Sequence, residues 1–123
     1  MSVEGLPPDD QHRQVFLDNL VSGNDAHLAL CPGIQLCRLL AGTQVGLALQ
    51  ITPDALQARQ VQQVLERRFD QALAFDGCFV YLDAQGALVI WHALPAPSLL
   101  DKTISRLLSL ANLESLDPGR YRY

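Results

Sequence analysis

Apolar side chains recur at helical spacing in three stretches of the chain, which predicts helices over residues 10–22, 52–75 and 98–116. Thr52-Pro53-Asp54 is a typical helix start, with a hydroxyl cap followed by proline and an acid. Ser98 and Asp101 resemble a capping box at the start of the third helix. The apolar positions of the three helices are Val15, Phe16, Leu20 and Val21; Val61, Leu65, Phe69, Ala72 and Leu73; and Leu100, Ile104, Leu107, Leu108 and Ala111.

Alternating apolar and small residues, broken by turn residues, predict five strands between these helices. The predicted strands span residues 27–31, 34–40, 45–51, 78–83 and 87–94. The element order α-β-β-β-α-β-β-α therefore predicts an α+β fold, in which three helices flank an antiparallel sheet of about five strands.

The third predicted strand leaves one side of this sheet without charged residues. Its core-facing residues are Val45, Leu47, Leu49 and Ile51, and they alternate with Gly46, Ala48 and Gln50. The solvent-facing side of an antiparallel sheet normally carries strongly polar or charged side chains. We therefore expect something to cover this side of the sheet.

The composition contains more apolar residues than one small domain is expected to hide. The chain has 123 residues, of which 49% are hydrophobic and 18% charged, against a usual charged share of about a quarter. We expect a single domain over residues 1–123, with flexible tails at 1–8 and 117–123. Because a small domain has proportionally more surface, the apolar surplus indicates positions that another polypeptide covers. The alternative is that the second helix fills the core of one monomer more completely than usual.

Charge and cysteine content exclude several classes of function. The net charge is −4, the pI is about 5.1 and Lys102 is the only lysine, which disfavours binding to nucleic acid. The start of the chain lacks a secretory signal, and no apolar run is long enough to span a membrane. Three cysteines without CxxC spacing favour reduced thiols. We therefore expect a cytoplasmic protein.

The residue pattern gives little support to catalysis. His12, His27 and His92 fall in three different predicted elements, so we expect no metal site, and no glycine-rich nucleotide motif is present, so we expect no cofactor. Cys78 could act as a nucleophile only with a histidine partner in space, and a small buried side chain is its commoner role. We therefore expect that the chain is not an enzyme.

A family resemblance is carried by residues 64–110. Leu82-Asp83-Ala84-Gln85-Gly86-Ala87-Leu88-Val89 fits the pattern LDxxGxLV, and it is followed by Leu94-Pro95 and by a leucine-rich final helix from Leu99 to Leu110. In these motifs, in element order and in acidity, the chain resembles the class I chaperones of bacterial type III secretion systems. It departs from them at Val21-Ser22-Gly23, where the family commonly has a Leu-Gly pair.

The resemblance implies a small cytoplasmic dimer that binds the N-terminal region of a secreted client and keeps it competent for secretion. It implies a homodimer, or a heterodimer with a related chaperone, formed through the second helix. The residues expected at the dimer interface are Val61, Val64, Leu65 and Phe69. The residues expected to contact the client are Phe16, Leu20, Leu28, Leu36 and Leu47.

Two other readings remain open at the level of sequence. One is a small dimeric α+β enzyme with a site at the dimer seam that uses Cys78 and His92. The other is a regulatory protein-interaction module unrelated to secretion.

Overall fold

The computed structural model describes the backbone of residues 9–116 and the side chains of residues 13–116. The predicted flexible tails, 1–8 and 117–123, lie outside the described residues. The helices are α1 (Asp9–Ser22), α2 (Gln60–Asp70) and α3 (Leu100–Leu110). The strands are β1 (His27–Cys31), β2 (Ile34–Ala41), β3 (Gln44–Ile51), β4 (Cys78–Leu82) and β5 (Leu88–Ala93).

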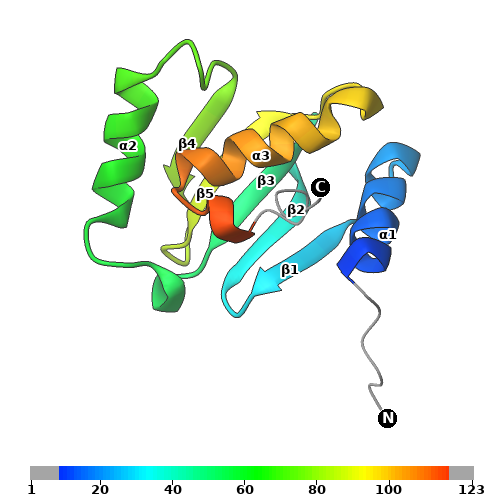
Figure 1. Cartoon of the computed structure of the whole chain (residues 1–123), viewed down its shortest axis with the longest axis horizontal. Helices are drawn as coiled ribbons and strands as arrows, with labels where there is room; N and C mark the ends of the chain where they lie inside the picture. Colours follow the sequence, from blue (N-terminus) through cyan, green and yellow to red (C-terminus); the bar gives the residue numbers. More distant parts are fainter. Residues whose placement is uncertain (1–8, 117–123) are drawn as a thin grey trace.

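The five strands form one antiparallel sheet in the order β1-β2-β3-β5-β4. Helices α1 and α3 lie on one face of this sheet, and α2 lies at its margin beyond β4 (Figure 1). The predicted α+β fold and its element order are confirmed. The sheet has two edge strands, β1 and β4, of which β1 is interrupted by a bulge between Ala29 and Cys31.

The main core lies between α1, α3 and the helix-covered face of the sheet. Strand residues at alternate positions enter it from every strand, as the period of two requires. The largest fully buried side chains are Phe16, Leu20, Leu36, Leu47, Leu49, Ile51, Leu88, Ile90, Ile104, Leu107, Leu108 and Leu110.

The prediction of one helix over residues 52–75 is wrong. Thr52-Pro53-Asp54 starts only a short 3₁₀ helix, Pro53–Ala55, after which Leu56 adopts an extended conformation. Ala55 and Leu56 pack against the main core, so burying them takes the chain out of a helical path. The helix restarts at Gln60, after an N-cap residue, Arg59, whose φ of 66° is left-handed, and it ends at Asp70.

The third helix is also shorter than predicted, and its capping box is absent. Leu99 occupies the N-cap without a side-chain hydrogen bond, while Asp101 forms an ion pair with Arg13 of α1. At the other end Asn112 has a φ of 61°, and Leu113 N–H bonds to the Leu108 carbonyl at 2.8 Å. This left-handed cap stops α3 before residue 116.

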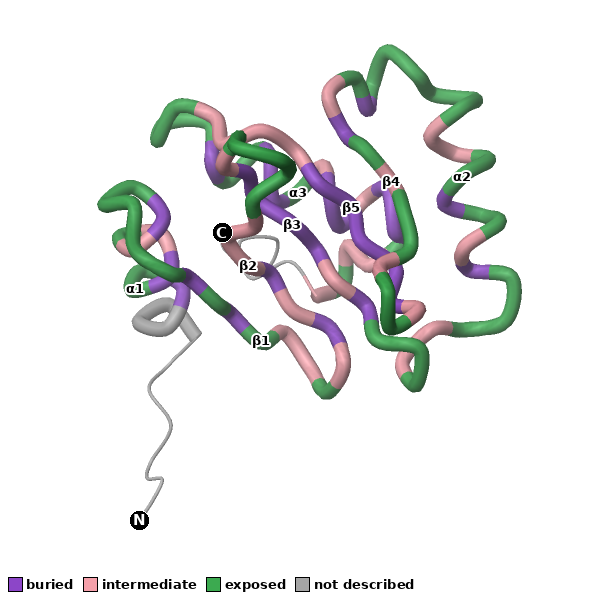
Figure 2. The backbone as a smooth tube through the Cα atoms, turned by 180° about the vertical axis from the view of Figure 1, so that it is seen from behind, coloured by how far each residue is buried: buried purple, intermediate pink, exposed green. Residues whose placement is uncertain are grey.

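The second face of the sheet is covered in part by its own Trp91. In the described part of the chain no helix packs there, and the buried cluster on this face consists of strand residues alone (Figure 2). The Trp91 ring lies over Gly46, where an added Cβ would come within 2.2 Å of ring atoms. Its indole Nε1 donates to the Leu39 carbonyl at 2.9 Å. The small residues of β3 are therefore explained by the tryptophan that lies on them, at least at the centre of the sheet.

Replacing Gly46 with alanine should lower the free energy of unfolding by about 1–3 kcal/mol, because the new methyl group overlaps the Trp91 ring. Denaturant unfolding followed by tryptophan fluorescence measures this change. Gln44→Ala, at an exposed position of the same strand, is the matched control and should be nearly neutral. Equal stability of Gly46→Ala and the parent would contradict the described position of Trp91.

Candidate functional site

Large apolar side chains are exposed mainly along α2, the turn after it and β4. Phe69 is 83% exposed and Leu73 is 95% exposed, values unusual for residues of this kind. Single exposed apolar residues are common, but a cluster in one region marks an interaction surface. The exposed members are Leu65, Phe69, Leu73, Phe79, Tyr81 and Leu82.

Helix α2 separates its residues into a face toward the body and a face toward solvent. Gln60 and Val64 are buried against the body, and Val61 is half-buried. Leu65 and Phe69 follow at helical spacing on the outer side, and the helix lies beyond β4 at the edge of the molecule (Figure 1). Val61, Leu65, Phe69 and the following Leu73 are called the α2 stripe below.

The second face of the sheet is the other candidate surface. Phe79 and Tyr81 of β4 lie on this face opposite Trp91 and Val89, and the Phe79 and Trp91 rings are 6.0 Å apart between centroids. The strand residues that point to this side include no aspartate, glutamate, lysine or arginine. They are His27, Ala29, Gln35, Cys37, Leu39, Ala41, Gln44, Gly46, Ala48, Gln50, Phe79, Tyr81, Val89, Trp91 and Ala93. This set is called the open face.

A row of side-chain hydrogen bonds crosses the open face. His27 bonds to Gln35, Gln35 donates to Gln50 at 2.6 Å, and Gln50 donates to Asp83 at 3.0 Å. The row links β1, β2 and β3 to the turn between β4 and β5. The open face therefore has an aromatic part on β4 and β5 and, beside it, a polar row that ends at the Asp83 carboxylate.

Asp83 organises the turn at the end of that row. Its Oδ1 accepts the backbone N–H groups of Ala87 and Gln85, each at 2.9 Å. The bond from Ala87 is the largest cause that lowers the pKa of Asp83, and the bonds from Gln50, Gln85 and Gly86 act in the same direction. The carboxylate is thus a structural acceptor.

The structure places the residues predicted at the dimer interface in different environments, some exposed and some buried. Leu65 and Phe69 point outward, Val61 is half-buried, and Val64 is 2% exposed and anchors α2 to the core.

The five residues predicted to contact a client are all buried. Phe16 and Leu20 of α1 and the sheet residues Leu28, Leu36 and Leu47 pack together in the main core. A client would reach them only if α1 left the sheet.

Cys78 and His92 are brought together, but not in a catalytic arrangement. They lie opposite each other on β4 and β5. Burial raises the pKa of the Cys78 thiol, although Arg106 and Arg68 lower it in part. His92 Nδ1 donates to the Ala93 carbonyl at 2.6 Å, and within residues 13–116 no hydrogen bond joins the thiol to the imidazole. A neutral buried thiol without a base is a poor nucleophile.

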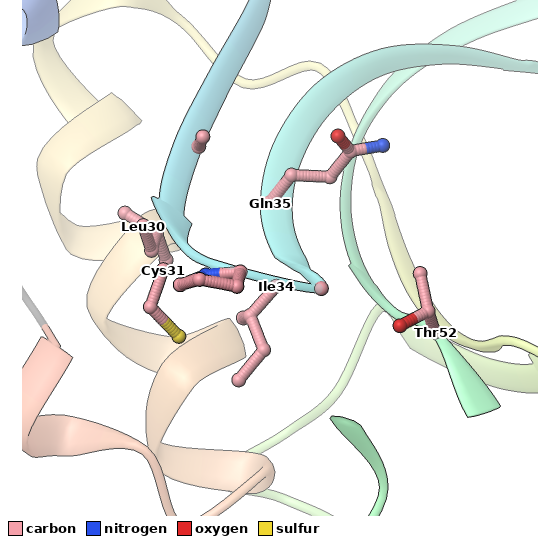
Figure 3. A pocket seen from close by; sticks show the side chains of 8 residues that line it. Leu30, Cys31, Ile34, Gln35 and Thr52 are labelled. Carbon is pink, nitrogen blue, oxygen red and sulfur yellow. The ribbon is translucent and has the colours of Figure 1, made fainter. Parts of the chain in front are cut away.

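A hollow of about 510 Å³ lies at the β1–β2 turn (Figure 3). It lacks charged side chains among its lining residues, and its thiol, Cys31, has no histidine beside it there. Its lining is Ala29, Leu30, Cys31, Pro32, Gly33, Ile34, Gln35 and Thr52. Such a hollow fits an apolar side chain better than an ionic ligand.

Residues 13–116 contain no group of three or more metal-ligating side chains. In the described part of the chain, no helix has the length and apolar character needed to cross a membrane.

The family model described as HrpV-like matches residues 5–116. The chain belongs to the HrpV-like family. This family is associated with type III secretion and is non-catalytic, and HrpV is a regulator of that system. No curated protein and no solved structure matches the chain. The association with type III secretion predicted from the sequence is confirmed, while the class I chaperone role stays a prediction.

Sequence reasoning missed part of the exposed surface of this HrpV-like chain. Nothing in the sequence marks Phe79 and Tyr81 as exposed, because alternation along a strand does not tell which side the helices cover. Leu73 was placed inside a long helix, whereas it lies in the turn after α2. The one available signal was the excess of apolar over charged residues.

Acid should weaken this fold partly through Asp83. Because the folded state lowers the pKa of Asp83, its stabilising effect is complete above the ordinary value near 3.8 and is lost as pH falls through the lowered value. Asp83→Asn keeps a side-chain oxygen for the turn and removes the titration. Urea midpoints at pH 7, 4 and 2.5 should fall less steeply for Asp83→Asn than for the parent, and parallel profiles would contradict the assignment.

Proposed function

We propose that this HrpV-like chain is a non-catalytic chaperone of type III secretion that acts as a dimer. It binds the N-terminal region of a secreted protein in the bacterial cytoplasm and keeps that region competent for secretion. The observation that carries the proposal is the exposed α2 stripe, in which Phe69 and Leu73 contact little of their own chain. Family membership supports the setting.

The α2 stripe is the proposed dimer interface. Burying a side chain such as Phe69 or Leu65 contributes about 1.5–3 kcal/mol, which gives two copies, or this chain and a related one, a reason to associate. Val61 is the half-buried first residue of the stripe. Val64 has a different role, because it packs against the core on the inner side of the helix.

The open face is the proposed client surface. Phe79 and Tyr81 are exposed there, and the hydrogen-bonded polar row from His27 to the Asp83 carboxylate lies beside them. An extended client segment cannot bury its own apolar side chains, and an uncharged aromatic surface offers burial without demanding charged partners. Phe16, Leu20, Leu28, Leu36 and Leu47 then support this surface from inside the core.

A second candidate function is regulation of the secretion system through protein binding. It is favoured by the family match, because HrpV is a regulator. In that case the same surfaces would bind a regulatory protein that is not itself secreted. Deleting the gene discriminates the two: loss of one secreted protein with normal transcripts supports the chaperone, and altered transcripts of secretion genes support the regulator.

Replacing Phe69 with glutamate should convert the dimer to a monomer, because a charge would be buried at the centre of the interface. Sedimentation equilibrium at tens of micromolar measures the mass. Gln62→Glu adds the same charge at an exposed position of α2 and should leave the dimer intact. Circular dichroism should show an unchanged fold, and a parent protein that is purely monomeric would refute the proposed dimer.

Replacing Phe79 and Tyr81 with serine should reduce client recovery about tenfold or more without dissociating the dimer, since each loses an aromatic contact. The measurement is co-purification from the native host, with the bound protein identified by mass spectrometry and tested for secretion. Ser98→Ala, at an exposed position that is not part of the open face, is the control. Equal recovery with all variants would place the client elsewhere.

A further inference from the structure

Helix α2 is held to the molecule largely by polar side chains. Val64 is its one fully buried apolar residue, and Gln60 is buried beside it. Arg67 donates to the Ser109 carbonyl at 2.7 Å, and Arg68 donates to the Cys78 carbonyl at 2.8 Å. A weaker bond joins Gln60 to the Ala111 carbonyl at 3.4 Å.

The two arginines attach α2 to two different elements. Ser109 lies in the last turn of α3, where a cation is favourable, and its carbonyl also accepts the Asn112 N–H at 3.0 Å. Cys78 begins β4, the edge strand, and its carbonyl accepts the guanidinium from outside the sheet. Arg67 therefore fixes α2 to α3, and Arg68 fixes it to β4.

These attachments determine how α2 is rotated about its axis. Successive helical residues differ by about 100°, so turning Arg67 and Arg68 toward the body directs Phe69 and Leu65 outward. Val64 and the half-buried Val61 give α2 its apolar contact with the core, and the two arginine bonds add fixed contacts to α3 and β4.

Helix α2 has little intrinsic stability with which to hold its own position. It spans only Gln60–Asp70, and isolated helices shorter than about 12–15 residues are marginal in water. Its N-cap, Arg59, is left-handed and provides no side-chain cap, and the left-handed conformation costs roughly 1–2 kcal/mol for a residue with a side chain.

We propose that Arg67 and Arg68 are positioning residues for partner binding: their bonds to the Ser109 and Cys78 carbonyls fix the rotation of α2 and so present the α2 stripe. The occupant of the stripe is a second copy of this chain, and the inference rests on the proposed function in that respect. Neither arginine needs to touch the second copy.

The test combines hydrogen exchange with dimer affinity in the full chain. Arg67→Ala and Arg68→Ala should each speed amide exchange in α2 and weaken self-association about tenfold, the size expected for losing one charge-assisted hydrogen bond. Arg67→Lys and Arg68→Lys retain a donor and a charge, and should restore a large part of both properties. Gln63→Ala, at an exposed position of α2, should change neither.

Unfolding followed by Trp91 fluorescence reports the sheet separately from α2 and should be nearly unchanged in the single variants. If an alanine variant fails to fold, the comparison of the lysine variants with the parent still tests whether the geometry of the donor group affects dimer affinity. Unchanged dimer affinity in both alanine variants, with Phe69→Glu monomeric, overturns the positioning role and leaves the proposed dimer standing. Unchanged affinity in Phe69→Glu as well overturns both, and hydrogen exchange then shows whether the arginines merely anchor the helix.

Discussion

The burial of β3 and β5 on both of their faces is the constraint on which the rest of the structure depends. Leu47, Leu49 and Ile90 face α1 and α3, while Ala48, Val89 and Trp91 form a second buried cluster on the opposite side. A helix covers only one side, so a side chain of the sheet has to close the other. Trp91 does so because Gly46 leaves room for its ring. The centre is thereby closed to solvent on both sides, and the large exposed apolar side chains lie further out, on β4 and along α2.

The two candidate surfaces differ in how firmly the core supports them. Phe79 and Tyr81 belong to a strand that pairs along its length with β5, so the sheet fixes the position of the aromatic part of the open face. The α2 stripe belongs to a short helix attached through Val64 and through hydrogen bonds to backbone carbonyls. Binding at the open face would therefore use a surface that the sheet already holds in place, whereas binding at the stripe would depend on the position of an attached helix.

The sequence predicts the sheet well because its signals are local and consistent. The alternation from Val45 to Ile51 and the Asp83–Gly86 turn each identify a strand or hairpin without reference to the rest of the chain. The prediction of the second helix fails because a local signal is overridden by tertiary contacts. Thr52-Pro53-Asp54 is a sound local helix start, but burial of Ala55 and Leu56 against the core ends the helix there. The candidate site residues likewise differ in whether local sequence is enough to predict them. Leu65 and Phe69 are recognisable as one side of a helix, but Phe16 and Leu36 look identical to surface candidates until the packing of α1 is known.

The bond between Arg68 and the Cys78 carbonyl has a consequence for solubility. The sequence Cys78–Leu82 contains neither proline nor charge, and an apolar edge strand of this kind is a template on which further strands stack. β1 avoids this hazard with its bulge and the following Pro32. On β4 an incoming strand has to displace a charged donor before it can pair at Cys78. The same arginine that holds α2 therefore also hinders the pairing of further strands with the β4 edge and the growth of fibres from it.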